Sequence, residues 1–104
     1  MPVRIRINIA AFAVILTLAA VSVWAISKDA AKYNEDGVAA LKNGDYYSAI
    51  DCFSRALSYE NDNQVIKNNL SNAYNNYGLY QLKKGQTLNA IDNFEKSLRF
   101  NPEN

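Results

Sequence analysis

Hydrophobic and polar positions follow one pattern before residue 28 and another after it. The first pattern is a run of uncharged, mostly apolar residues, 7–27. In the second, residues 28–104, large apolar side chains recur at steps of three and four between polar ones. This spacing is typical of amphipathic helices and differs from the alternation of strands. The chain is therefore predicted to be all-α, with one apolar helix followed by several amphipathic ones.

The second part of the chain contains the same residue pattern twice, 41 residues apart. A fixed spacing of small, glycine and aromatic residues is the signature of a repeat architecture. We therefore expect two similar structural units. The matched pairs are Tyr33/Tyr74, Asn34/Asn75, Gly37/Gly78, Leu41/Leu82, Lys42/Lys83, Gly44/Gly85, Ala49/Ala90, Ile50/Ile91, Asp51/Asp92, Phe53/Phe94, Ala56/Ser97, Leu57/Leu98 and Tyr59/Phe100.

Each unit is predicted to be a helix, a tight turn and a second helix. Gly44 and Gly85 stand where a left-handed residue closes the first helix, and Asp45 stands at the N-cap of the helix after it. Gly37 and Gly78 lie within the first helices, where glycine costs roughly 1 kcal/mol relative to alanine. We therefore expect a neighbouring helix to approach closely at these two positions.

These repeated residues resemble the tetratricopeptide repeat. The resemblance covers two frames, about residues 30–63 and 71–104, and implies an α-solenoid fragment made of two helix-turn-helix repeats. One departure is Asn61, where the family has the proline that Pro102 supplies in the second unit. The residues that carry the resemblance are Tyr33, Gly37, Leu41, Gly44, Ala49, Phe53 and Ala56, and then Tyr74, Gly78, Leu82, Gly85, Ala90, Phe94, Ser97 and Pro102.

Seven residues, 64–70, lie between the two frames. They contain no glycine or proline, and Val65, Ile66 and Leu70 continue the apolar stripe of the following helix. We interpret them as an early start to the second unit's first helix, which would run from about residue 63 to 84. A loop is the alternative.

The apolar run 7–27 has the length of a membrane span. As a helix it would cover the roughly 30 Å of a bilayer's hydrocarbon core, and Trp24 near its end suits the interface. We expect a transmembrane helix or uncleaved signal anchor, preceded by a basic flank, residues 1–6. A secretory signal cleaved after Ala25 is the alternative, although signal cores are usually shorter, about 7–15 residues.

The orientation follows from Arg4 and Arg6, which lie before the apolar run without an acidic neighbour. Basic residues favour the cytoplasmic side of a membrane. The prediction is a single-pass protein with a cytoplasmic N-terminus and its repeats on the periplasmic, lumenal or extracellular side. A cleaved signal would place the repeats on that same side. Whether the membrane helix continues unbroken into the first repeat stays open.

The composition argues against catalysis and against nucleic-acid binding. The chain has no histidine, and its one cysteine, Cys52, has no internal disulfide partner. The net charge of +1 offers no basic surface for phosphates. Asp51 and Asp92 recur at matching positions, which could suggest a catalytic pair of carboxylates. Each is predicted on a separate helix next to a core-facing isoleucine, so we expect them on solvated helix faces instead. We expect no enzyme activity, no cofactor and no metal.

The family resemblance implies a groove lined by the first helix of each repeat, in which a peptide or helix of another protein lies. Asparagine amides both donate and accept hydrogen bonds and therefore suit a peptide backbone. The resemblance also places Leu41 and Leu82 at groove positions on the same helices, but we expect these two leucines to belong to the core. The candidate groove residues are Asn34, Val38, Lys42, Asn75, Leu79 and Lys83.

The second repeat is expected to leave an apolar face open, because stacked repeats bury their faces only against neighbours. Ala90, Phe94 and Leu98 are predicted to form this exposed C-terminal face. A second copy, a partner, the membrane or further sequence would cover it.

Taken together, the sequence predicts a membrane-anchored scaffold or adaptor for protein–protein interaction, without catalysis of its own. One alternative is the N-terminal portion of a longer enzyme or of a multi-repeat assembly factor. Another is a secreted adaptor, processed after Ala25.

Overall fold

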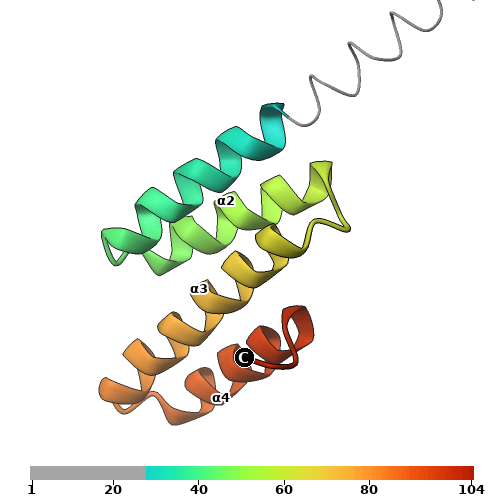
Figure 1. Ribbon diagram of the computed structural model, residues 1–104. Helices are drawn as coiled ribbons and strands as arrows, with labels where there is room; N and C mark the ends of the chain where they lie inside the picture. Colours follow the sequence, from blue (N-terminus) through green and yellow to red (C-terminus); the bar gives the residue numbers. More distant parts are fainter. Residues whose placement is uncertain (1–27) are drawn as a thin grey trace, which may run out of the picture.

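The computed structural model describes residues 28–104, and the predicted basic flank and membrane span lie outside the described residues. Residues 28–42 are helical. They are followed by α2 (Tyr46–Tyr59), α3 (Gln64–Lys83) and α4 (Thr87–Phe100). Figure 1 shows these helices as two antiparallel pairs, one formed by 28–42 and α2 and the other by α3 and α4. The predicted all-α architecture of helical repeats is confirmed for this part of the chain.

The turn inside each pair depends on a glycine with a left-handed backbone. Gly44 has a φ of +75° and Gly85 a φ of +78°. An L side chain is strained in this region, whereas glycine is not. After the first turn, Asp45 caps α2 by accepting a hydrogen bond from the Ser48 N–H at 3.1 Å. Gln86 occupies the same place before α4 and makes no side-chain cap.

Helix α3 begins before the second repeat frame does. Its N-cap is Asn63, whose Oδ1 accepts from the backbone N–H groups of Val65 and Ile66 at 3.0 and 3.2 Å. Residues 64–70 are therefore helical, and Ile66 and Leu70 are buried, whereas Val65, which was expected on the same apolar stripe, is 63% exposed. These residues lengthen α3 because they continue its apolar stripe towards the first repeat.

Within each pair, a phenylalanine ring lies against a bare glycine Cα. A Cβ placed on Gly37 would come within 2.6 Å of the ring of Phe53, and one placed on Gly78 within 2.6 Å of the ring of Phe94. Only glycine permits so close an approach. The mid-helix glycines are thus explained by helix–helix contact.

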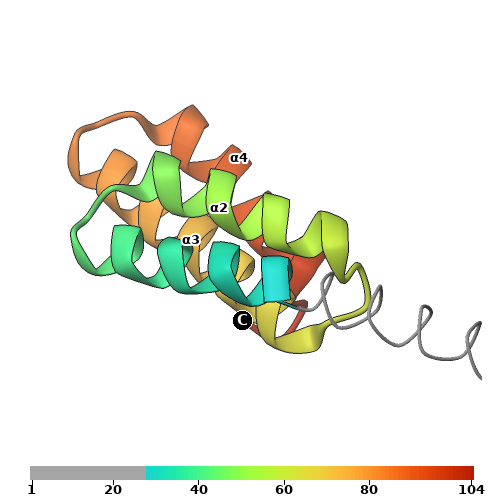
Figure 2. The ribbon, with the colours of Figure 1, turned by 90° about the horizontal axis from the view of Figure 1, so that it is seen from above.

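Two clusters of buried residues join the pairs to each other. The larger contains Ala49, Phe53, Leu70 and Ala73, and the smaller contains Ala30, Ala56 and Ile66. Helix α3 contributes to both clusters, and it packs against α2 on one side and α4 on the other. Figure 1 shows α3 between α2 and α4, and Figure 2 shows the helices from above. Helix α3 therefore connects the two repeats by packing against both.

Two small polar networks fix α3 against α4. Ser71 Oγ donates to the Ser97 carbonyl oxygen at 2.8 Å, and Asn104 Nδ2 donates to the hydroxyls of both serines at 2.9 Å. Asn93 Nδ2 donates to Gln81 Oε1, and both side chains are buried. Every buried side-chain polar atom of residues 28–104 has a partner, as buried polar groups require.

No helix within residues 28–104 combines the length and the apolar character needed to cross a bilayer.

We predict that Gly37→Ala destabilises the protein more than Gly78→Ala does. The new methyl group overlaps the fully buried ring of Phe53, and such overpacking costs about 1–3 kcal/mol. Alanine's better helix propensity offsets roughly 1 kcal/mol of this. Phe94 is only partly buried and can move outward. Thermal unfolding followed by circular dichroism checks the order, and equal melting temperatures for the two variants would contradict it.

We also predict opposite effects from changing the two helix caps. Hydrogen bonding to Ser48 lowers the pKa of Asp45 in the folded protein. The carboxylate therefore stabilises the fold above its unfolded pKa, and this contribution disappears as the pH falls through the folded pKa. Asp45→Ala should lower the melting temperature at pH 7, and Gln86→Asp should raise it, each by on the order of a few degrees. Both differences should shrink at about pH 3, near and below the carboxyl's ordinary pKa of about 3.9. Differences that persist unchanged there would refute an ionic cap.

Candidate functional site

The predicted groove residues lie on the first helix of each pair, residues 28–42 and α3. Asn34 and Asn75 are half-buried, and Lys42 and Lys83 are exposed. Asn34 Oδ1 accepts a hydrogen bond from Asn69 Nδ2 at 2.9 Å. One of the two expected peptide-binding amides therefore already takes part in a bond between the repeats.

The apolar groove positions differ between the repeats. Val38 and Leu41 are half-buried, because they pack against the core cluster that Leu70 and Ala73 of α3 complete. Their counterparts Leu79 and Leu82 are 45% and 48% exposed. Leu82 was predicted to belong to the core, and this prediction is wrong because no helix of the described chain covers that side of the second repeat. An accessible apolar strip is thus found on α3 and not on residues 28–42.

The predicted C-terminal face needs a correction. Ala90 is fully buried, and Phe94 is partly buried, with its ring against Gly78. Of the three predicted residues, only Leu98 is exposed, with 47% of its surface accessible. Ile91, which the prediction omitted, is 48% exposed. The 41-residue offset could have identified Ile91. Its counterpart Ile50 packs against the core of the first repeat, so Ile91 belongs to the equivalent face of the second repeat.

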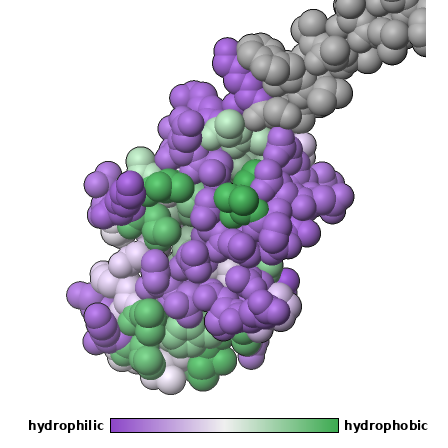
Figure 3. Space-filling model, viewed as in Figure 1, coloured by the Kyte–Doolittle hydropathy of each residue, from purple (hydrophilic) through white to green (hydrophobic). Residues whose placement is uncertain are grey.

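Apolar side chains gather at the end of the molecule where α3 turns into α4 (Figure 3). The exposed large apolar residues on these two helices are Leu79, Tyr80, Leu82, Leu88, Ile91 and Leu98, together with Val65 near the start of α3.

In each helix pair, two aromatic rings stack at a distance from the turn that joins the helices. Tyr33 stacks on Tyr59, and Tyr74 stacks on Phe100, each with ring centroids 6.0 Å apart. A cation lies over the first ring of each stack: the guanidinium carbon of Arg55 is 6.0 Å from the Tyr33 centroid, and Lys96 Nζ is 5.9 Å from the Tyr74 centroid. These stacks explain the recurring tyrosines as packing within each repeat.

Asp51 and Asp92 hold those cations in place. Asp51 Oδ2 lies 3.0 Å from Arg55 Nε, and Asp92 Oδ2 lies 2.9 Å from Lys96 Nζ. The hydrogen bond to Asp92 raises the pKa of Lys96. The two aspartates thus sit in separate surface ion pairs, as expected for solvated helix faces, and the structure does not bring them together as a catalytic pair.

Cys52 has the environment of a structural cysteine. Its side chain is half-buried. Burial raises the pKa of its thiol, and the neighbouring carboxylates of Asp36 and Asp51 raise it further. The thiolate is the reactive form of cysteine, so this thiol is poorly suited to nucleophilic chemistry at neutral pH. Residues 28–104 also contain no group of three or more acidic or cysteine side chains placed to hold a metal ion.

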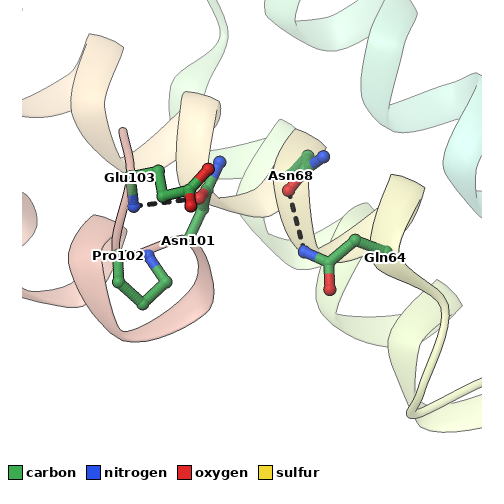
Figure 4. A pocket seen from close by; sticks show the side chains of 5 residues that line it. All are labelled: Gln64, Asn68, Asn101, Pro102 and Glu103. Atoms are coloured by element: carbon green, nitrogen blue, oxygen red, sulfur yellow. Dashed lines mark hydrogen bonds between the residues drawn. The ribbon is translucent and has the colours of Figure 1, made fainter.

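A shallow polar cleft of about 400 Å³ lies between the start of α3 and the residues after α4. Two hydrogen bonds join groups of this cleft: Gln64 Nε2 donates to Asn68 Oδ1 at 2.9 Å, and the backbone N–H of Glu103 donates to Asn101 Oδ1 at 3.1 Å (Figure 4). Pro102 completes the wall. The cleft offers a few amide groups and one carboxylate, without a set of residues suited to catalysis.

The chain belongs to the tetratricopeptide repeat family. The family's sequence model matches residues 33–63 and 71–104, which together make up more than half of the chain. These matches coincide with the two helix pairs and with their repeated glycine–phenylalanine contacts. No curated protein and no solved structure matches the chain significantly. Family membership supports a role in protein–protein interaction, in which repeats of this kind typically act as non-catalytic scaffolds.

Proposed function

We propose that this protein is a membrane-tethered scaffold whose repeats hold a segment of another protein in the groove formed by residues 28–42 and α3. The proposal rests on family membership together with the side chains that α3 exposes. An amide, an apolar side chain and a cation lie there at successive turns, as Asn75, Leu79 and Lys83, and all three have accessible surface.

The groove is suited to a peptide that combines a free backbone with an apolar side chain. Asn75 can both donate to and accept from a peptide group, and Leu79 can pack against an aliphatic side chain. Lys42 and Lys83 lie at the ends of the two first helices, where they favour an acidic group on the ligand. The ligand would therefore be a protein segment with an acidic residue near an aliphatic one.

The tether in this proposal is the apolar segment 7–27, with the N-terminus in the cytoplasm and the repeats on the other side of the membrane. Its length and lack of charge support this, as do Arg4 and Arg6 before it. The protein would then present its groove to partners in the periplasm, a lumen or the exterior.

The groove is tested by photocrosslinking from defined positions in living cells. Benzoylphenylalanine at position 42 or 83 should give the same partner adduct, and the probe at position 54, on the exposed side of α2, should not. Asn75→Ala should reduce the adduct about fivefold, because one lost hydrogen bond costs about 1 kcal/mol. Adducts that are equally strong from position 54, or insensitive to Asn75→Ala, would contradict the groove.

The tether is tested by alkaline carbonate extraction of membranes from cells that express the full chain. We expect the protein to stay in the membrane pellet with its full mass, and the repeats to be digested only by protease added on the non-cytoplasmic side. Release into the supernatant at the mass of residues 26–104 would instead identify a secreted adaptor. Digestion from the cytoplasmic side would overturn the proposed orientation.

A further inference from the structure

A recess of about 330 Å³ lies beside one of the predicted groove residues, Asn34. Its walls come from the start of residues 28–42, the loop between α2 and α3, and the start of α3; the lining residues are Ala31, Asn34, Glu60, Asn63, Val65 and Ile66. Figure 1 shows these segments at one end of the molecule and the two glycine turns at the other. Lys42 and Lys83 lie just before those turns. The recess is therefore at the end of the groove that is remote from the two lysines.

The recess depends on the early start of α3. Val65 and Ile66 belong to residues 64–70, which lie between the two stretches that match the repeat family. At the 41-residue offset, the position of Glu60 is occupied by a neutral residue, Asn101. The combination of this recess with a carboxylate is thus a feature of this chain and not of the repeat pattern.

Glu60 is the one charged residue among the six that line the recess. Its Oε2 accepts a hydrogen bond from Asn63 Nδ2 at 2.7 Å, and Asn63 is itself fixed because its Oδ1 caps α3. Glu60 is half-buried, and no ion pair found within residues 28–104 includes it. The carboxylate is therefore held in place by the cap residue and can accept further hydrogen bonds.

Apolar surface lies next to this carboxylate. Ile66 is buried, and the accessible side chains of Ala31 and Val65 line the recess beside it. Asn34 Oδ1 accepts one hydrogen bond from Asn69 and has a second lone pair for another donor. A side chain that suits these surroundings has an aliphatic stem and a cationic end with several N–H donors. Lysine and arginine have both features.

We propose that this recess, here called the acidic recess, binds a lysine or arginine side chain of the same protein segment that the groove holds. This inference rests on the proposed function and specifies its ligand further. Along the first helix, Ala31 and Lys42 are about 16 Å apart at 1.5 Å per residue. An extended segment covers that distance in about five residues. The ligand would therefore carry a basic residue about five positions from the acidic residue that Lys42 and Lys83 favour.

The test is an NMR titration of the isotopically labelled full chain in detergent with two defined peptides. One peptide carries a lysine and a glutamate five positions apart, with a leucine two positions from the glutamate, in a background of serine and alanine. In the other, norleucine replaces the lysine and keeps the aliphatic stem without the ammonium group. We expect the lysine peptide to bind about five- to tenfold more tightly, because its ammonium gains a charge-assisted hydrogen bond to a half-buried carboxylate. The side-chain amide signals of Asn34 and Asn63 should shift with the lysine peptide.

A matched pair of variants assigns this preference to the acidic recess. Glu60→Gln removes the charge and keeps an oxygen that can accept from Asn63, so it should abolish the preference for lysine over norleucine. Asp62→Asn removes the same charge from an exposed residue of the same loop that does not line the recess. It should change the preference by less than about twofold, because exposed charges interact weakly. Circular dichroism melting checks that both variants are folded.

Three results would overturn the acidic recess. One is equal or undetectable binding of the two peptides to the unmodified chain. Another is a preference for lysine that Glu60→Gln leaves unchanged. The third is a shift of the Asn34 and Asn63 amide signals when the protein concentration is raised without peptide, since the occupant would then be a basic side chain of a second copy.

The groove and the acidic recess can fail separately. The side-chain amide of Asn75 reports on the groove and should shift with both peptides. If it shifts while the two peptides bind equally, the groove stands and the acidic recess fails. If the lysine preference and its loss in Glu60→Gln are seen without a shift at Asn75, the acidic recess stands and the groove fails. If neither peptide binds, the acidic recess fails, and crosslinking from positions 42 and 83 still decides the groove.

Discussion

The contact between a phenylalanine ring and a bare glycine Cα holds each helix pair together, and the rest of the fold depends on the distance that this contact sets. Phe53 fits against Gly37 and Phe94 against Gly78 because no Cβ intervenes. The small residues Ala49 and Ala90, one turn before these phenylalanines on α2 and α4, are fully buried. In the first pair, Ala49 and Phe53 form a buried cluster with Leu70 and Ala73 of the next helix, α3.

Helix α3 packs against the first helix pair, so the two repeats have different surroundings. It begins at Gln64, ahead of the second repeat frame, so Ile66 and Leu70 reach back over the first pair. The repeats also differ where Ala40 and Cys52 of the first correspond to Gln81 and Asn93 of the second. The buried hydrogen bond between those two amides fixes α3 on α4, and the first pair has no equivalent.

The exposed side chains of α3 and α4 differ in kind along the second repeat. Asn75, Leu79 and Lys83 of the proposed groove combine an amide, an aliphatic side chain and a cation, which would suit an extended peptide segment. Ile91 and Leu98 on α4 are aliphatic and exposed, and they lie outside the proposed groove.

The sequence by itself determined the all-α class, the two repeats, the turns at Gly44 and Gly85 and the family. These follow from local chemistry, namely the positive φ that glycine tolerates and the spacing of side chains along a helix. Only the tertiary structure decided which apolar side chains are accessible. Leu41 and Leu82 occupy the same place in the repeat pattern, yet α3 covers one and leaves the other open, and Ala90 is buried where exposure was expected. Burial depends on which element lies opposite a residue, and no property of the residue itself contains that information.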